Sequence, residues 1–293
     1  MRAAVEAAFA PSNGTRRIGL ELEMHVRRTT PALTPELVER GRPSFEPGGQ
    51  LELGLPPQCS VDALLGEVDW CLGEVTRRAE VAFAGVDPWR SLEATPLTRP
   101  TPRYLAMQEL FDRAGDAGRR MMRLTASLQV CIDLLPGQAG REQWLVANLA
   151  GPDLVAAFGG SLERTRIWLG IDPERTAYDG RHLDAHEPIE AYVDFARAAE
   201  RFAIPEATED GYHLSTLFPP VRPRGGYLEL RYLDSQVPTA GLLDTVWTLM
   251  YDERARREAL DLLLPTLPRL WERWTTADPA DLLSIASGQV VAA

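Results

Sequence analysis

The chain has 293 residues, of which 45% are hydrophobic and 25% are charged, and its formal net charge is -11. This composition is typical of a globular protein that buries a sizeable core in one large domain or two closely joined ones. The negative charge argues against a protein that follows nucleic acid or an acidic membrane surface, because both need a positive field. No apolar stretch has the length that a transmembrane helix needs, so we expect no membrane partner.

The sequence contains no lysine, so every fixed positive charge is an arginine. Any clamp for phosphate or carboxylate groups must therefore be made of guanidinium groups, whose planar forks suit bidentate contacts. The absence of lysine also excludes the P-loop and protein-kinase mechanisms, both of which use one. An acidic protein can still bind an anion such as ATP when divalent cations mediate the contact.

The three cysteines, Cys59, Cys71 and Cys131, are an odd number without C-x-x-C spacing. They predict neither a zinc site nor a disulfide framework, and reduced thiols in a cytoplasmic protein are the simplest interpretation. The first ten residues resemble a signal peptide at first sight, but Glu6 interrupts a short apolar run. We interpret this segment as a short helix.

Residues 17–26 predict a strand on which Glu21 and Glu23 face one side and apolar residues the other. Two carboxylates on an otherwise apolar strand are consistent with a metal site. They are also consistent with the solvated face of an amphipathic strand, and the E-x-E pattern alone favours this second interpretation.

Three further segments, residues 44–57, 125–133 and 227–234, also predict strands with one polar face. The first is punctuated by a Pro-Gly-Gly sequence at 47–49. The side chains of interest on these segments are Glu46, Gln50, Glu52, Ser127, Gln129, Cys131, Asp133, Glu229 and Arg231.

Helices and loops are expected between the strands. Apolar periodicity predicts helices at the positions given below. Proline and glycine mark connections at 28–42 and 87–102, and the second is expected to be a surface loop that borders a site. The arginines of residues 164–176 are consistent with ordinary surface charge. Long helical connections instead of tight hairpins indicate an antiparallel or mixed sheet with helices stacked on one side, an α+β fold. The helices are expected at 61–82, 104–113, 142–158, 188–202, 242–251 and from 253 onward, with a short strand at 81–86.

The polar residues on the strands suggest metal-dependent chemistry without a covalent nucleophile. Ligand sets made of oxygen atoms select hard cations such as magnesium or manganese. Carboxylate-held magnesium combined with arginine is the apparatus of phosphoryl transfer. The sequence has no G-x-S-x-G elbow, and its four histidines lack metal-ligand spacing, with His213 the possible exception because it enters the 216–224 loop.

The sequence E-P-G-G-Q-L-E-L at 46–53 resembles the corresponding motif of the plant-type glutamate-cysteine ligases. The resemblance is strongest to their bacterial relatives that make γ-glutamylcysteine for ergothioneine synthesis. Further matching motifs are collinear and reach about residue 253. They are G-L-E-L-E at 19–23, P-R-Y-L-A-M-Q at 102–108, G-R-R-M-M at 118–122, T-A-S-L-Q-V-C-I-D at 125–133, I-W-L-G-I-D-P-E-R-T at 167–176, H-L-S-T-L-F-P-P-V-R at 213–222 and Y-L-E-L-R-Y-L-D at 227–234.

This resemblance implies a fold similar to the catalytic half of glutamine synthetase. It implies one catalytic domain over residues 1–293, with a curved, mostly antiparallel sheet that forms a funnel and helices on its outer face. The implied activity is an ATP- and magnesium-dependent ligation in which the γ-carboxylate of glutamate is phosphorylated and then attacked by the amine of cysteine. Manganese could replace magnesium.

The resemblance also assigns roles, motif by motif. The implied metal ligands are Glu21, Glu23, Glu46, Glu52, Gln129 and Glu229. Arg231 would contact the transferring phosphate and act with Glu229 in catalysis. Arg164 and Arg175 are expected to bind ATP phosphate or the carboxylates of glutamate, and Gln50 and Arg222 are further expected cofactor contacts.

The chain departs from the family at several positions. The span between residues 202 and 211 is reduced, and Cys131 stands where many relatives have asparagine. Shortened elements near a funnel mouth alter an acceptor pocket more readily than a metal core, so the acceptor amine stays open. The alternatives are a ligase for another amine and a paralogue that binds a nucleotide or metabolite without turnover.

Overall fold

A single antiparallel sheet organises the computed structural model, which describes residues 1–27, 33–159 and 161–288. The strand order is β2-β3-β1-β5-β7-β6, and β4 pairs with β1 beside this path. All strand pairings among these described residues are antiparallel. The strands are β1 (Ile18–Val26), β2 (Pro43–Phe45), β3 (Leu51–Gln58), β4 (Val81–Ala82), β5 (Ser127–Asp133), β6 (Val221–Pro223) and β7 (Tyr227–Asp234).

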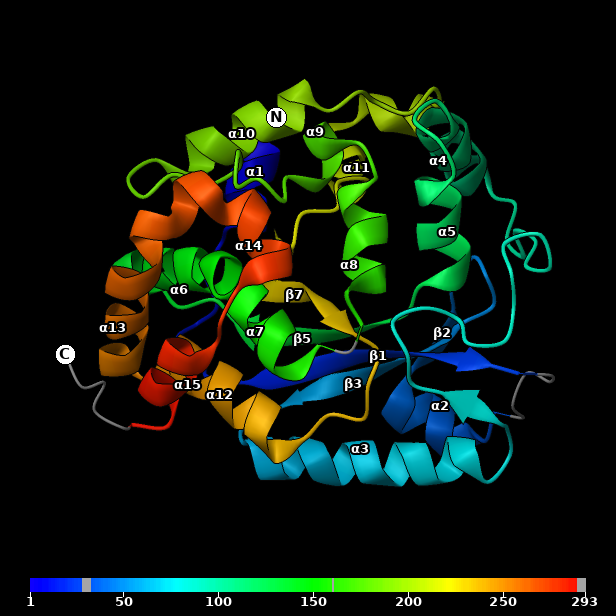
Figure 1. The fold of residues 1–293 in the computed structure, drawn as a ribbon, viewed down its shortest axis with the longest axis horizontal. Helices are drawn as coiled ribbons and strands as arrows, with labels where there is room; N and C mark the ends of the chain where they lie inside the picture. Colours follow the sequence, from blue (N-terminus) through cyan, green and yellow to red (C-terminus); the bar gives the residue numbers. More distant parts are fainter. Residues whose placement is uncertain (28–32, 160, 289–293) are drawn as a thin grey trace.

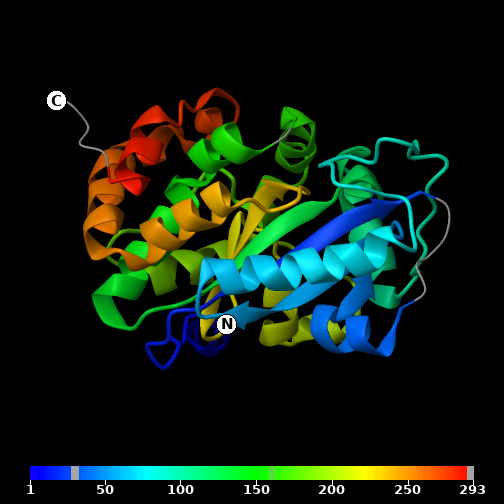
Figure 2. The same ribbon diagram turned by 90° about the horizontal axis from the view of Figure 1, so that it is seen from below.

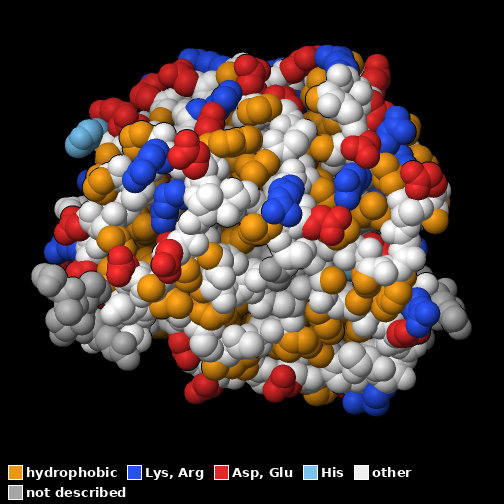
Figure 3. All heavy atoms as spheres, viewed as in Figure 1, with side chains coloured by type: hydrophobic (Ala, Val, Ile, Leu, Met, Phe, Trp, Pro, Cys, Tyr) orange, Lys and Arg blue, Asp and Glu red, His pale blue; other side chains and the backbone are white. Residues whose placement is uncertain are grey.

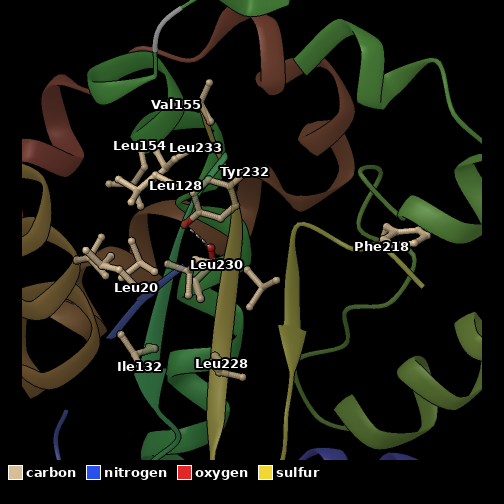
Figure 4. Close-up of a cluster of buried hydrophobic side chains, with 14 of the residues drawn as sticks. Leu20, Leu128, Ile132, Leu154, Val155, Phe218, Leu228, Leu230, Tyr232 and Leu233 are labelled. Atoms are coloured by element: carbon tan, nitrogen blue, oxygen red, sulfur yellow. Dashed lines mark hydrogen bonds between the residues drawn. The ribbon is translucent and has the colours of Figure 1, made fainter. Parts of the chain in front are cut away.

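The apolar face of this sheet forms the centre of the core, since alternate residues of each strand point to the same side. Leu20, Leu128 and Leu230 are almost fully buried on adjacent strands. Figure 4 shows them on the same side of β7, together with residues of α7, whereas Phe218 lies on the opposite side of β6 and β7. Burial of this face fixes the register, because a slip of one residue would turn the apolar side chains into the opposite layer.

Four helices cover the apolar face. They are α3 (Val61–Thr76), α6 (Gly137–Leu149), α7 (Gly151–Phe158) and α12 (Ala240–Tyr251). Figure 2 shows α3 lying along the sheet, with α12 next to it. The hydroxyl of Ser60 caps α3 by accepting from the Ala63 N–H at 3.2 Å, which satisfies one of the free amides of the first turn.

Three other helices stand over the polar face of the sheet, on the side away from α3 (Figure 1). They are α4 (Pro102–Asp112), α5 (Ala117–Leu124) and α8 (Leu162–Leu169). Proline at the first position of α4 and the Thr101 hydroxyl, which accepts from the Tyr104 N–H, fix where that helix begins.

The remaining elements lie at the periphery. The N-terminal helix α1 packs against α10 and α11, above the end of the sheet that carries β6. The peripheral elements are α1 (Arg2–Ala8), α2 (Pro35–Gly41), α9 (Pro173–Thr176), α10 (Pro188–Ala198), the 3-10 helix η1 (Pro205–Thr208), α11 (Asp210–Ser215), α13 (Glu253–Leu263), the 3-10 helix η2 (Leu264–Arg269), α14 (Leu270–Thr276) and α15 (Ala280–Ala286).

The predicted α+β class with an antiparallel sheet is confirmed. The expectation of helices on one side is too narrow, because α4, α5 and α8 cover the polar face as well. The connection expected at 28–42 contains α2, and residues 28–32 of that segment lie outside the described residues. The helix expected at 142–158 is divided into α6 and α7 at Ala150. Pro152 lacks an N–H there, and a Cβ on Gly151 would meet the Trp274 ring at 2.5 Å.

The β2–β3 hairpin depends on the glycines of the Pro-Gly-Gly sequence. Gly49 has a φ of 86°, a left-handed conformation that glycine adopts without strain. A Cβ on Gly48 would lie 2.1 Å from the carbonyl oxygen of Arg123, so only glycine lets the turn approach the end of α5. The hairpin is thereby held against the end of α5, one of the helices over the polar face, and Glu46 is held there with it.

Acidic and arginine side chains are interspersed over the face of the molecule shown in Figure 3. Among the described residues, no helix has both the length and the apolar character needed to cross a bilayer.

Candidate active site

A cavity of about 190 Å³ lies between the polar face of the sheet and the helices α4, α5 and α8. Its floor carries carboxylates and amides from the strands, and its roof carries methionine and aromatic side chains. Among the residues predicted from the sequence, it is lined by Glu21, Glu23, Glu46, Gln50, Glu52, Gln129, Arg164, Arg222 and Arg231.

Strand register brings the floor residues together. Glu23 is paired with Glu52 across β1 and β3, and Glu52 is paired with Ser44 across β3 and β2. One row further along, Glu21 is paired with Gln129 across β1 and β5. Directly paired residues on one face have neighbouring side chains, so residues more than a hundred positions apart in the sequence form one polar surface.

Two of the carboxylates on this surface accept hydrogen bonds from neighbouring strands. Glu23 accepts from the Ser127 N–H at 2.7 Å and from the Gln129 amide at 3.0 Å. Glu52 accepts from the Ser44 hydroxyl at 2.8 Å. Among the described residues neither carboxylate has an ion pair with an arginine, so these bonds orient the groups without neutralising them.

The carboxylates of the floor bind protons more tightly than carboxylates in water do. Burial, followed by the charges of Glu229 and Glu52, raises the pKa of Glu21 to about 7. Burial, followed by Glu23 and Glu52, raises the pKa of Glu46 to about 8. Burial also raises the pKa of Glu23 and of Glu52. This end of the cavity therefore holds excess negative charge that a cation would neutralise.

The opposite end of the polar surface is basic. Glu229 is paired with Cys131 on β5 and with Arg222 on β6. Arg222 donates to Glu229 Oε1 at 2.7 Å, Arg231 contacts the same oxygen, and Arg224 lies 3.2 Å from Oε2. Three guanidinium groups thus surround one fully buried carboxylate.

This arrangement reverses the effect of burial on Glu229. Burial alone would raise its pKa, but Arg222, Arg231 and Arg224 lower it to about 2. Burial would likewise lower the pKa of Arg231, and the charges of Glu229 and Glu21 raise it instead. Glu229 is therefore ionised at neutral pH and held by arginines, whereas the carboxylates of the floor lack such partners.

Several buried polar atoms at the cavity have no hydrogen-bond partner within the protein. They include Gln50 Oε1, Gln129 Oε1 and the Nε atoms of Arg164, Arg222 and Arg231. The amide of Gln50 donates to the carbonyl of Thr125 at 2.7 Å, which leaves its oxygen free. Buried polar groups normally find partners, so free atoms that gather at one cavity indicate a polar ligand.

Of the arginines in residues 164–176, Arg166 is exposed, but Arg164 and Arg175 are buried, so the interpretation as surface charge is wrong for these two. Arg164 is 2% exposed, lines the cavity, and donates to the β7 carbonyls of Arg231 and Tyr232. Arg175 is fully buried and lies outside the cavity lining, where it donates to the Thr216 carbonyl and hydroxyl. The structure therefore brings Arg164, but not Arg175, to the cavity.

The histidine singled out in the sequence, His213, is also outside the cavity lining. Its Nε2 lies 2.7 Å from the Ala196 carbonyl oxygen, and its side chain is buried.

Sequence reasoning missed the roof of the cavity and one arginine. Arg224 directly follows β6, two positions after Arg222, and this spacing could have identified it. The roof residues lie in segments that match the family motifs at 102–108, 118–122 and 167–176, but the resemblance gave them no role. They are Arg103, Tyr104, Met107, Met121, Met122 and Trp168.

The floor offers carboxylate and amide oxygens as ligand atoms, and two of the amide oxygens have no hydrogen-bond partner among the described residues. Oxygen ligands of this kind fit a hard divalent cation. In the part of the chain that the structure describes, no three His, Cys, Asp or Glu side chains form a ready-made metal group. The carboxylates line one cavity without converging on a point, so a cation would have to draw them together.

A second cavity of about 470 Å³ adjoins the site and shares Glu21 with it. We call it the outer cavity. Its walls are largely apolar and include Pro57, Tyr227 and two glycines without side chains, Gly19 and Gly54. The thiol of Cys131 faces it, and burial, followed by Glu21, raises the pKa of this thiol well above its usual range.

The chain belongs to the glutamate-cysteine ligase family 2, whose model matches residues 17–277. The matched segment contains the whole sheet and all the described helices except α1 and α15, and with them every residue of the cavity floor. The protein is therefore a ligase of the glutamate-cysteine ligase class.

Named relatives agree with this family. The chain is 32% identical over 319 residues to the glutamate-cysteine ligase EgtA of Mycolicibacterium smegmatis, covering 88% of this chain and 74% of that protein. It is 28% identical to the chloroplastic glutamate-cysteine ligase of Arabidopsis thaliana, covering 77% of this chain and 52% of the plant protein.

A search of solved structures gives a bifunctional glutathione synthetase from Pasteurella multocida. The TM-score is 0.46 at 12% identity, covering 98% of this chain and 48% of that one.

The raised pKa values predict how stability depends on pH. Burial raises the pKa of folded Glu46 to about 8, whereas its ordinary value is 4.5. Between these values the folded protein binds more protons than the unfolded chain, so the free energy of unfolding falls as pH rises. We expect a fall of a few kcal/mol, roughly 1.4 kcal/mol per pKa unit, between pH 5 and 8.5 without metal, measured by urea denaturation, and a smaller one in Glu46→Gln.

Glu39→Gln on an exposed face of α2 provides the matched control, which should keep the wild-type pH dependence. If the free energy of unfolding fell equally with pH in Glu46→Gln and in wild type, the raised pKa of Glu46 would not be the cause of that fall.

Proposed function

We propose that the protein is an ATP- and magnesium-dependent ligase that joins the γ-carboxylate of glutamate to an amine through γ-glutamyl phosphate. The observation that carries this proposal is the division of charge in one cavity. Carboxylates without an ion pair among the described residues line one end, and Arg222 and Arg231 line the other. These two arginines share Glu229 with Arg224, and neither Glu229 nor Arg224 is itself part of the cavity lining. This pattern suits a substrate that brings both cations and phosphate.

The outer cavity is the proposed site of the nucleotide base and sugar. Gly19 and Gly54 leave its floor without side chains, and Pro57 and Tyr227 provide flat apolar walls. Glu21 lies at the boundary with the inner cavity. A nucleotide bound there would extend its phosphates past Glu21 toward Arg222 and Arg231.

The proposed metal ligands are Glu21, Glu23, Glu46, Glu52 and Gln129, with Glu229 added once its arginines turn to phosphate. Magnesium bound there would neutralise these carboxylates and the phosphates, and manganese offers the same chemistry. Glu229 holds Arg222 and Arg231 in place beforehand, so little reorganisation is needed when phosphate arrives.

The chemistry requires no nucleophile from the protein. A γ-carboxylate oxygen of glutamate attacks the terminal phosphorus of ATP, and the bond to ADP breaks. The amine then attacks the carbonyl carbon of the γ-glutamyl phosphate, and phosphate leaves with the former carboxylate oxygen while the amine loses a proton. Arg231 and Arg222 would stabilise charge on the transferring group, and Arg164 is placed to bind a substrate carboxylate.

Cysteine is the proposed acceptor. Met107, Met121 and Met122 give the roof of the cavity soft, polarisable sulfur atoms beside the Trp168 ring. Such a wall suits a small apolar or thiol side chain better than a charged one. A different amine of similar size is the alternative.

Purified protein with ATP, magnesium and glutamate should release ADP only when an amine is added, and cysteine should give the highest kcat/KM of an amine panel. Coupled spectrophotometry of ADP and mass spectrometry of the product measure this. Absence of amine-dependent ADP release with every amine would refute ligase activity. A better amine than cysteine would refute only the acceptor.

Loss of one carboxylate should stop turnover. Glu52→Gln and Glu229→Gln should each lower magnesium-dependent ADP formation by at least about a hundredfold, because the first removes a metal ligand and the second the group that holds the arginines. Circular dichroism and thermal melting confirm folding, and Glu39→Gln serves as control. Wild-type activity in both variants would show that the assignment of the site is wrong.

A further inference from the structure

A third cavity, of about 270 Å³, lies beneath the N-terminal helix and outside the site described so far. We call it the α1 cavity. It is bounded by α1, α10, α11 and the β6–β7 turn, and it is lined by Ala4, Ala7, Tyr192, Ser215, Arg222 and Arg224. Figure 1 shows α1 and α11 beside one another above this end of the sheet.

One side chain, Arg222, separates the α1 cavity from the active-site cavity, because it lines both of them. Its guanidinium is bound to Glu229 at 2.7 Å, and its buried Nε has no partner. A rotation of this side chain would change whether the two cavities are connected.

The charges between the two cavities do not balance. Arg222, Arg224 and Arg231 form ion pairs with Glu229, and no other ion pair of theirs occurs among the described residues. Glu229 is thus the one ion-pair partner that the three guanidinium groups share among the described residues, and Glu21 is a further carboxylate whose charge acts on Arg224 and Arg231. Arg222 and Arg231 are only 13% and 14% exposed, so water compensates them poorly, whereas Arg224 is 39% exposed. Arg222 and Arg224 therefore have capacity to bind an anion.

The α1 cavity has fixed walls and free space. The amide of Gly225 donates to the Ala8 carbonyl at 2.7 Å, and the amide of Gly226 donates to the Ala10 carbonyl at 2.7 Å. These bonds tie the turn to the N-terminal segment. The small side chains of Ala4 and Ala7 leave the space between helix and turn open.

We propose that the α1 cavity binds inorganic phosphate through Arg224 and Arg222, and that phosphate released at Arg231 leaves the active site through it. The phosphate-release part of this inference rests on the proposed function, because it needs the ligation to produce phosphate. The binding part does not, since it concerns the free protein. ADP then leaves by the outer cavity, independently of phosphate.

The binding test uses isothermal titration calorimetry of the full chain with inorganic phosphate, without nucleotide. Arg224→Gln should weaken phosphate binding by about tenfold, as expected for loss of a charge-assisted contact. Ala7→Phe should weaken it at least as much by filling the cavity. Ala3→Phe, one turn before Ala7 on the same helix and outside the lining, is the matched control and should bind like wild type.

A second titration separates free phosphate from the terminal phosphate of a nucleotide. Phosphate should still bind when a non-hydrolysable ATP analogue saturates the protein, and Ala7→Phe should not weaken binding of the analogue. Equal weakening of the analogue by Ala7→Phe would make the cavity a nucleotide subsite and overturn the proposal. Unchanged phosphate binding in folded Ala7→Phe and Arg224→Gln, judged by thermal melting, would overturn it as well.

Rapid-quench kinetics test the exit route. In Ala7→Phe the first turnover should form the γ-glutamyl product at the wild-type rate, and later turnovers should be several-fold slower, which gives a burst. An equal steady-state rate in Ala7→Phe and Ala3→Phe would refute the route. Failure of wild type to form any ADP would instead refute the proposed function and leave the phosphate titration as a separate result.

Discussion

Separation of charge across one cavity is the constraint on which the rest of this structure depends. At one end, burial raises the pKa of Glu21 to about 7 and of Glu46 to about 8, and neither has an arginine partner. At the other end, three arginines hold the pKa of Glu229 at about 2. An imbalance of this kind costs stability in the free protein, so it is explained by a ligand that supplies the missing charges.

The sheet and its two layers of helices maintain this separation. Register pairs Glu23 with Glu52 and Glu229 with Arg222, and burial of residues such as Leu20 and Leu230 on the apolar face prevents a slip that would exchange the faces. The glycines of the β2–β3 hairpin bring Glu46 to the same cavity. The chain belongs to the glutamate-cysteine ligase family 2, and the arrangement of charges in the cavity explains which chemistry its matched segment supports.

Much of the floor was predictable, because alternation along a strand is a local property that the sequence displays directly. Alternation assigned Glu21, Glu23, Glu52 and Gln129 to polar strand faces, the family resemblance marked them as site residues, and the structure brings all four to one cavity. The roof was not predictable, since it depends on how α4, α5 and α8 pack across the sheet. Arg175 shows the same limit, because its position in the sequence did not reveal that its guanidinium binds backbone outside the cavity.

The central claim is that the cavity promotes transfer of the terminal phosphoryl group of ATP to the γ-carboxylate of glutamate, which activates this carboxylate. Glutamate labelled with oxygen-18 in its γ-carboxylate tests this directly in the complete reaction with ATP, magnesium and cysteine. The account predicts that mass spectrometry finds one labelled oxygen in each inorganic phosphate released. Product formation with unlabelled phosphate would contradict it.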